Sequence, residues 1–138
     1  MALMEVNFFS KALMRPVTMN VILPVDKVFF GEETEEENKP FKTLYLLHGV
    51  MGNYTDWVTG TCIKRWAEEK NLAVVMPSGA NMFYMDHPNA NENYSEFIGK
   101  ELVKITRRMF PLSHKKKIHL SPGYLWRIRC NPKWSEIP

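Results

Sequence analysis

The chain has 138 residues, a hydrophobic fraction of 45% and a formal net charge of +3. This composition is ordinary for one globular domain with its own core, and it excludes a chain that is disordered throughout. The positive charges gather in the last third of the sequence. A basic segment can bind nucleic acid through phosphate contacts, but none here is interleaved with stacking aromatic residues. We therefore expect a solvated surface and no nucleic-acid partner.

The cysteine spacing and the N-terminal residues indicate the cellular compartment of the protein. Cys62 and Cys130 lie far apart without a C-x-x-C spacing, which argues against a disulfide scaffold and suits a reducing compartment. Residues 1–10 contain Glu5 and lack the basic start and apolar run of a signal peptide. No stretch approaches the roughly 18 apolar residues that a membrane span needs. We therefore expect a cytoplasmic protein without a membrane partner.

The N-terminal segments predict two strands. Residues 3–9 alternate loosely between apolar and polar side chains, and residues 17–23 carry β-branched side chains at alternating positions between Pro16 and Pro24. Because a short turn joins the two segments, we expect an antiparallel hairpin over residues 3–23 at the edge of a sheet.

An acidic stretch follows the hairpin. Residues 32–38 (EETEEEN) repel one another, and Lys39-Pro40 interrupts strand pairing, so a solvated loop is expected. A calcium loop is the alternative, but the stretch lacks the glycine and the alternating acids that such a loop requires.

Two continuous apolar runs, residues 42–47 and 72–76, are typical of parallel strands buried on both faces. Between them, residues 62–70 place apolar side chains at the i, i+3, i+4 spacing of a helix face. A second helix, capped by Asn93 or Ser95, is expected after a long polar and aromatic loop. This order of elements predicts an α/β fold with a parallel sheet.

The segment LYLLHGVMGNYTDW resembles the group of α/β-hydrolases that contains esterase D, S-formylglutathione hydrolase and tributyrin esterase. The resemblance continues through LAVVMP, NMFYMD and the helix before FPLS, and it covers about residues 1–115. It implies an α/β-hydrolase fold and the hydrolysis of small acyl esters, either short-chain carboxylic esters or S-formylglutathione, through a serine acyl-enzyme. It implies no metal and no organic cofactor, and it leaves homo-oligomer formation open.

In this family the turn after the third strand supplies one backbone N–H to the oxyanion hole. The resemblance assigns that donor to Val50, while Gly49 and Gly52 let the backbone turn sharply and approach a substrate. A plain strand-to-helix connection is the alternative. The family's catalytic histidine follows the serine and the acid, so we expect His48 to orient the turn through hydrogen bonds. Trp57 is expected to pack under the turn.

The resemblance also places residues 81–86 at the border of the active-site cleft. Asn81, Tyr84 and Asp86 are therefore candidates for substrate contacts, with a packed loop as the alternative. His87 beside Asp86 suggests a metal pair, but no third ligand is spaced to complete a metal site.

The family pattern breaks after FPLS, where a G-L-S-M-G-G nucleophile elbow is due. Ser121 is a weak nucleophile candidate, because Pro122 has no amide for the second oxyanion donor. Codons can be chosen for residues 118–137 that, in two shifted frames, give D-T-F-I-A-G-L-S-M and then G-G-Y-A-A-I-R-N-G-L-K. We therefore predict half of a hydrolase domain over residues 1–114 and an aberrant, frame-shifted tail over residues 115–138.

The family's acid and histidine are expected beyond the end of this truncated sequence. We also expect the sheet to stop after its fourth strand, with an exposed apolar edge where the elbow strand would pair. Two hypotheses remain: the N-terminal half of an ester hydrolase, or a catalytically inactive fragment. A small basic nucleic-acid binder would rest on the tail alone.

Overall fold

Five strands form one mixed sheet in the part of the chain that the computed structural model describes, residues 1–27, 39–114 and 119–121. The order across the sheet is β1-β2-β4-β3-β5. β1 and β2 form an antiparallel hairpin, β2 pairs with β4 antiparallel, and β3 is parallel to both β4 and β5. The strands are β1 (Ala2–Ser10), β2 (Arg15–Leu23), β3 (Lys42–Leu46), β4 (Leu72–Pro77) and β5 (His119–Ser121).

The hairpin and the two apolar strands confirm the sequence-based predictions. The hairpin expected over residues 3–23 is β1 and β2, and β1 forms the edge of the sheet. The runs at 42–47 and 72–76 are β3 and β4, which are adjacent and parallel. The acidic stretch 32–38 lies outside the described residues.

The expectation that the sheet ends after four strands is wrong. β5 lies within the stretch assigned to an aberrant tail, and it pairs in parallel with Leu44–Leu46 of β3. Strand pairing uses main-chain N–H and C=O groups, which any sequence without proline supplies, so three residues can pair whatever their side chains. The rest of the tail, residues 115–118 and 122–138, lies outside the described residues.

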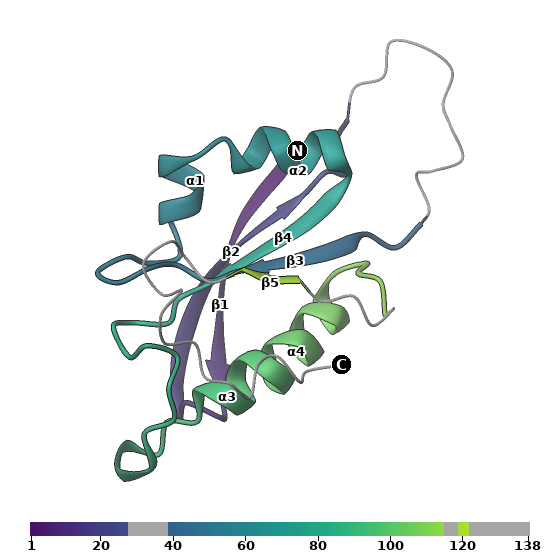
Figure 1. Ribbon diagram of the computed structural model, residues 1–138. Coiled ribbons are helices and arrows are strands. Elements are labelled where there is room, and N and C mark those ends of the chain that lie inside the picture. The colour runs from purple at the N-terminus through teal and green to yellow at the C-terminus, as the bar shows by residue number, and fades with distance from the viewer. Residues whose placement is uncertain (28–38, 115–118, 122–138) are drawn as a thin grey trace.

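Helices cover both faces of the sheet (Figure 1). α1 and α2 lie on one face, while α3, a π-helical turn and α4 follow one another without a break on the other. α2 is the crossover helix predicted over residues 62–70, and α1 was not predicted. Among the described residues, no helix has the length and apolar character needed to cross a membrane. The helices are α1 (Asp56–Gly60), α2 (Ile63–Lys70), η2 (Pro88–Ala90, a 3₁₀ turn), α3 (Tyr94–Glu96), η3 (Phe97–Glu101, the π turn) and α4 (Leu102–Met109).

The N-terminus of α3 is capped by a residue that the sequence did not indicate. The sequence-based prediction that Asn93 or Ser95 caps this helix is wrong, because neither side chain provides a cap. Instead, the carboxylate of Asp86 accepts hydrogen bonds from the Ser95 amide at 2.8 Å and from the Ser95 hydroxyl. A carboxylate suits this position because the helix N-terminus carries partial positive charge.

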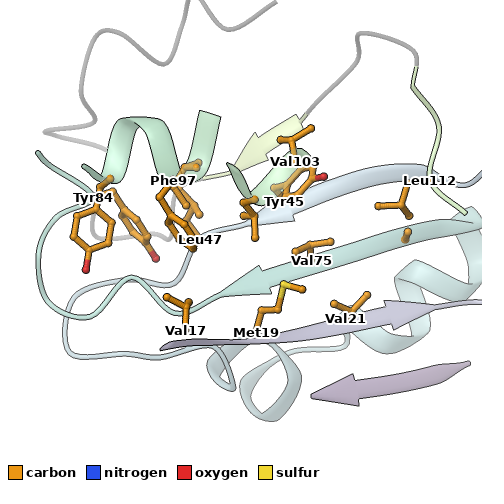
Figure 2. Close-up of a cluster of buried hydrophobic side chains, with 14 of the residues drawn as sticks. Val17, Met19, Val21, Tyr45, Leu47, Val75, Tyr84, Phe97, Val103 and Leu112 are labelled. Atoms are coloured by element: carbon orange, nitrogen blue, oxygen red, sulfur yellow. The ribbon is translucent and has the colours of Figure 1, made fainter. Parts of the chain in front are cut away.

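Side chains of the central strands alternate between two hydrophobic cores, as the two-residue period of a strand requires. Met19, Val21 and Val75 face the larger core, which the side chains of α3, the π turn and α4 complete (Figure 2). Ile22 and Val74 face the smaller core under α1 and α2. Burial on both faces fixes the position of β3 and β4, and hence of the loops at their ends.

Candidate functional site

A sharp turn follows β3. The amide of Gly52 donates to the carbonyl of Gly49 at 3.2 Å and closes a four-residue turn, with Val50 and Met51 at its centre. Met51 has φ of 62°, a left-handed conformation that costs a non-glycine residue about 1 kcal/mol. A Cβ at Gly52 would lie 1.8 Å from Oδ2 of Asp56, so glycine lets α1 approach the turn closely.

His48 fixes the start of this turn through hydrogen bonds at both nitrogens of its buried ring. Its side chain is 1% exposed, and Nε2 lies 2.8 Å from the backbone nitrogen of Gly79, which donates to it. Because Nε2 accepts a hydrogen bond, the ring proton belongs on Nδ1, which donates to the Gly49 carbonyl at 2.8 Å. The hydrogen bonds expected of His48 are therefore present, and both ring nitrogens are engaged.

The segment after β4 reaches back to the turn through two further hydrogen bonds. Oδ1 of Asn81 accepts from the Met51 amide at 2.7 Å, and the hydroxyl of Tyr84 donates to the His48 carbonyl at 3.4 Å. Tyr84 is only 3% exposed, and burial raises the pKa of its phenol. Gly79 allows this packing, because a Cβ there would lie 2.0 Å from Cε1 of Tyr84.

The same segment has an unusual backbone. Ala80, Phe83 and Tyr84 have φ of 46°, 53° and 49°, all in the left-handed region that disfavours side chains. Strained conformations of this kind persist where the surrounding structure holds them in place. Gly79, which anchors the segment to His48, was missed by the sequence analysis; its place in P-S-G, which begins at the last residue of β4, was the available signal.

The backbone N–H of Val50 differs from those of the two residues that follow it. The amides of Met51 and Gly52 donate to Asn81 and Gly49, whereas that of Val50 donates no hydrogen bond to any described residue. Val50 is partly exposed, so water or a ligand can reach the turn. The turn can thus offer one free backbone donor at the carboxyl end of the parallel strands, where α/β proteins bind their ligands.

Trp57 packs as expected. Its indole N–H donates to the Leu47 carbonyl at 3.1 Å, and its ring lies against the smaller core. This hydrogen bond joins α1 to Leu47, the residue before His48. Trp57 packs on the smaller core and Tyr84 on the larger one, so the two side chains support the turn from opposite faces of the sheet.

Other predicted site residues lie farther from the turn. Asp86 serves as the cap of α3, and the backbone amide of His87 donates to the Glu92 carbonyl at 2.8 Å. Substrate contacts by Asn81, Tyr84 and Asp86 remain predictions. No three His, Cys, Asp or Glu side chains gather as metal ligands in residues 1–27, 39–114 and 119–121.

Ser121 is brought to the same end of the sheet as the turn. It is the last residue of β5, and its main chain lies beside Leu46, two residues before His48. Two open hollows, of about 500 and 440 Å³, lie elsewhere. One adjoins the hairpin turn, and the other runs along the basic face of α4, so none of the predicted site residues lines either.

The strand order, the hairpin and the turn define the class of the protein, an α/β-hydrolase. The family described as "Putative esterase" matches residues 10–120, and the chain belongs to this family.

The similar proteins and structures are also esterases and serine hydrolases. An acetyl esterase of Caldicellulosiruptor saccharolyticus is 43% identical over 117 residues, which are 85% of this chain and 44% of the relative. Two Staphylococcus aureus structures, the fluorophosphonate-binding serine hydrolase FphF and the S-formylglutathione hydrolase FrmB, are 33% and 32% identical with TM-scores of 0.70. Each alignment covers 88% of this chain and 46% of the other. The chain thus spans about half the length of these relatives.

Proposed function

We propose that this chain carries the oxyanion-binding turn of a serine ester hydrolase, with the Val50 amide as the donor. The observation that supports the proposal is the free N–H of Val50 in a turn whose next two amides are both engaged. During acyl transfer the attacked carbonyl oxygen gains negative charge, and a preorganised N–H stabilises that charge in the transition state. The names of the relatives, an acetyl esterase, a serine hydrolase and an S-formylglutathione hydrolase, support the same chemistry.

The proposed substrates are small acyl esters, either short-chain carboxylic esters or the thioester S-formylglutathione. In both cases a serine hydroxyl attacks the acyl carbon, the alcohol or thiol leaves with a proton, and water then releases the acid. The Val50 amide would hold the oxygen of each tetrahedral intermediate. Neither step needs a metal or an organic cofactor.

The 138 residues contain no G-x-S-x-G motif. The sequence therefore offers no serine on a nucleophile elbow, and this chain by itself is proposed to be inactive. A cytoplasmic location belongs to the same proposal, supported by two distant cysteines, Cys62 and Cys130, that form no C-x-x-C framework.

The test begins with the nucleotide sequence of the gene through codons 115–138. If a shifted frame there encodes G-L-S-M-G-G, the continuous frame is expressed and assayed with a nitrophenyl acetate and with S-formylglutathione. Turnover of one of these substrates is expected, and its absence contradicts the proposal.

Val50→Pro then tests the donor. Val50 is the second residue of the turn, where proline is favoured, so this change removes the N–H while suiting the backbone. We expect kcat to fall about 100- to 1000-fold, the usual loss for an oxyanion donor, while the control Val50→Ala keeps its activity. Equal activity in both variants would remove Val50 from the mechanism.

A further inference from the structure

We propose that Asn81 is a positioning residue, which acts through Met51 to keep the Val50 amide presented as a free donor of the turn. This inference rests on the proposed function, and it goes beyond the expectation that Asn81 borders a substrate cleft. The observation behind it is the 2.7 Å hydrogen bond from the Met51 amide to Oδ1 of Asn81, across 30 residues of sequence.

Met51 adopts a backbone conformation that needs a stabilising contact. Its φ of 62° suits glycine or asparagine in this turn position, and Met51 gains nothing from packing because it is 87% exposed. Some other interaction must offset the cost of the left-handed conformation. The hydrogen bond to Asn81 is the side-chain contact in the described part of the chain that can do so.

Asn81 also determines which of the neighbouring amides in the turn is free. The turn has consecutive N–H groups at Val50, Met51 and Gly52, and the last bonds to Gly49. If Asn81 did not accept from Met51, two adjacent donors would be free to reorient toward solvent. With Asn81 in place, the peptide group of Met51 is fixed and the amide of Val50 remains free.

Asn81 itself is held by its neighbours. Gly79, two residues earlier, bonds to buried His48, and Tyr84, three residues later, is packed in the larger core. Asn81 is exposed, so replacing it removes a hydrogen bond and little packing. A variant at this position should therefore keep the fold and change the turn alone.

The test uses NMR of the 15N-labelled chain, with hydrogen exchange and amide shifts recorded for Val50 and Met51. Asn81→Ala is expected to speed exchange of the Met51 amide about three- to tenfold, the effect of losing one hydrogen bond, and to shift the Val50 resonance. Asn81→Asp keeps an acceptor oxygen and is expected to restore both readouts. Asn89→Ala, at an exposed asparagine in η2, is the matched control and is expected to change neither.

Unchanged Met51 exchange in Asn81→Ala, or failure of Asn81→Asp to restore it, would overturn the proposal. So would faster exchange of equal size at Val74 and Val75 in the centre of the sheet, because that result would mean general loosening. These NMR measurements do not depend on enzymatic turnover. A negative result for Asn81 can therefore be distinguished from a negative result in the Val50→Pro assay of the proposed function.

Discussion

His48 and Tyr84 are neighbours under the turn, with ring centroids 5.7 Å apart. The histidine uses both ring nitrogens in hydrogen bonds to backbone groups, so it has no nitrogen left to act as a base. The tyrosine supplies the bulk that closes the space beneath Gly79. Both side chains therefore support the turn, and under the proposed function the group that meets the substrate is the main-chain amide of Val50.

Tyr84 gives the chain a predicted pH dependence. Burial raises the pKa of its phenol above the ordinary value of 10.0 in the folded chain, with smaller contributions in the same direction from Tyr94 and Asp56. Above pH 10 the unfolded chain loses this proton and the folded chain keeps it. The stabilisation is thus complete below pH 10 and declines above it, by up to about 1.4 kcal/mol per pH unit.

Urea unfolding of the wild type and of Tyr84→Phe between about pH 9 and 11.5 measures this effect. The free energy of unfolding should fall less steeply with pH in the variant. Tyr45 and Tyr94, whose pKa values burial also raises, are present in both proteins and contribute to the slope that remains. Equal slopes would show that Tyr84 ionises in the folded state.

Three glycines differ in how closely other parts of the chain pack against them, so replacing each with alanine should change stability by a different amount. At Gly79 an added Cβ would meet the buried ring of Tyr84, which cannot move, so Gly79→Ala should destabilise by about 3 kcal/mol. At Gly52 it would meet the exposed carboxylate of Asp56, which can swing away, and the loss should be below about 1 kcal/mol. At Gly60, the last residue of α1, nothing lies within 4 Å.

Gly60→Ala is therefore the control and should change stability by less than about 1 kcal/mol, in the stabilising direction. Denaturant unfolding of the three alanine variants gives the ranking. If Gly79→Ala were as stable as Gly60→Ala, the packing of Tyr84 under the turn would be wrong.

The π turn η3 is hydrogen-bonded to the hairpin. Glu101, its last residue, accepts hydrogen bonds from the Ser10 hydroxyl at 2.5 Å, the Lys11 amide at 2.7 Å and the Ala12 amide at 3.2 Å. A π turn is one residue wider than an α-helical turn, so it changes the direction of the side chains that follow it. Here it joins the helix on one face of the sheet to the turn between β1 and β2.

The 138-residue chain as a whole is predicted to lack esterase turnover. A serine acyl-enzyme needs an activated hydroxyl with a histidine within about 3 Å, and both ring nitrogens of His48 are already bonded to the backbone. Ser121 ends β5 and precedes Pro122, which has no N–H for an oxyanion. An oxyanion donor without a nucleophile has little to act upon.

The assay is hydrolysis of a short-chain nitrophenyl ester by the purified chain beside its Ser121→Ala variant. Equal rates, both at the level of buffer, are expected. Turnover well above buffer that disappears in Ser121→Ala would make Ser121 the nucleophile.

The sequence by itself determined the hairpin, β3, β4 and α2, because the period of apolar residues is local and both faces of the sheet need burial. It also indicated the turn at His48–Gly52, through the order of motifs around it. It failed at the short β5, where pairing depends on the free edge of β3 and hardly on the side chains that pair.

The tertiary structure alone decided how the turn is held. Asn81 meets Met51 and Gly79 meets His48 across about 30 residues, and Asp86 reaches the start of α3. Such partners depend on the path by which the chain returns over the end of the sheet after β4. Left-handed residues such as Ala80 set that path, and no local pattern of apolar and polar residues encodes it.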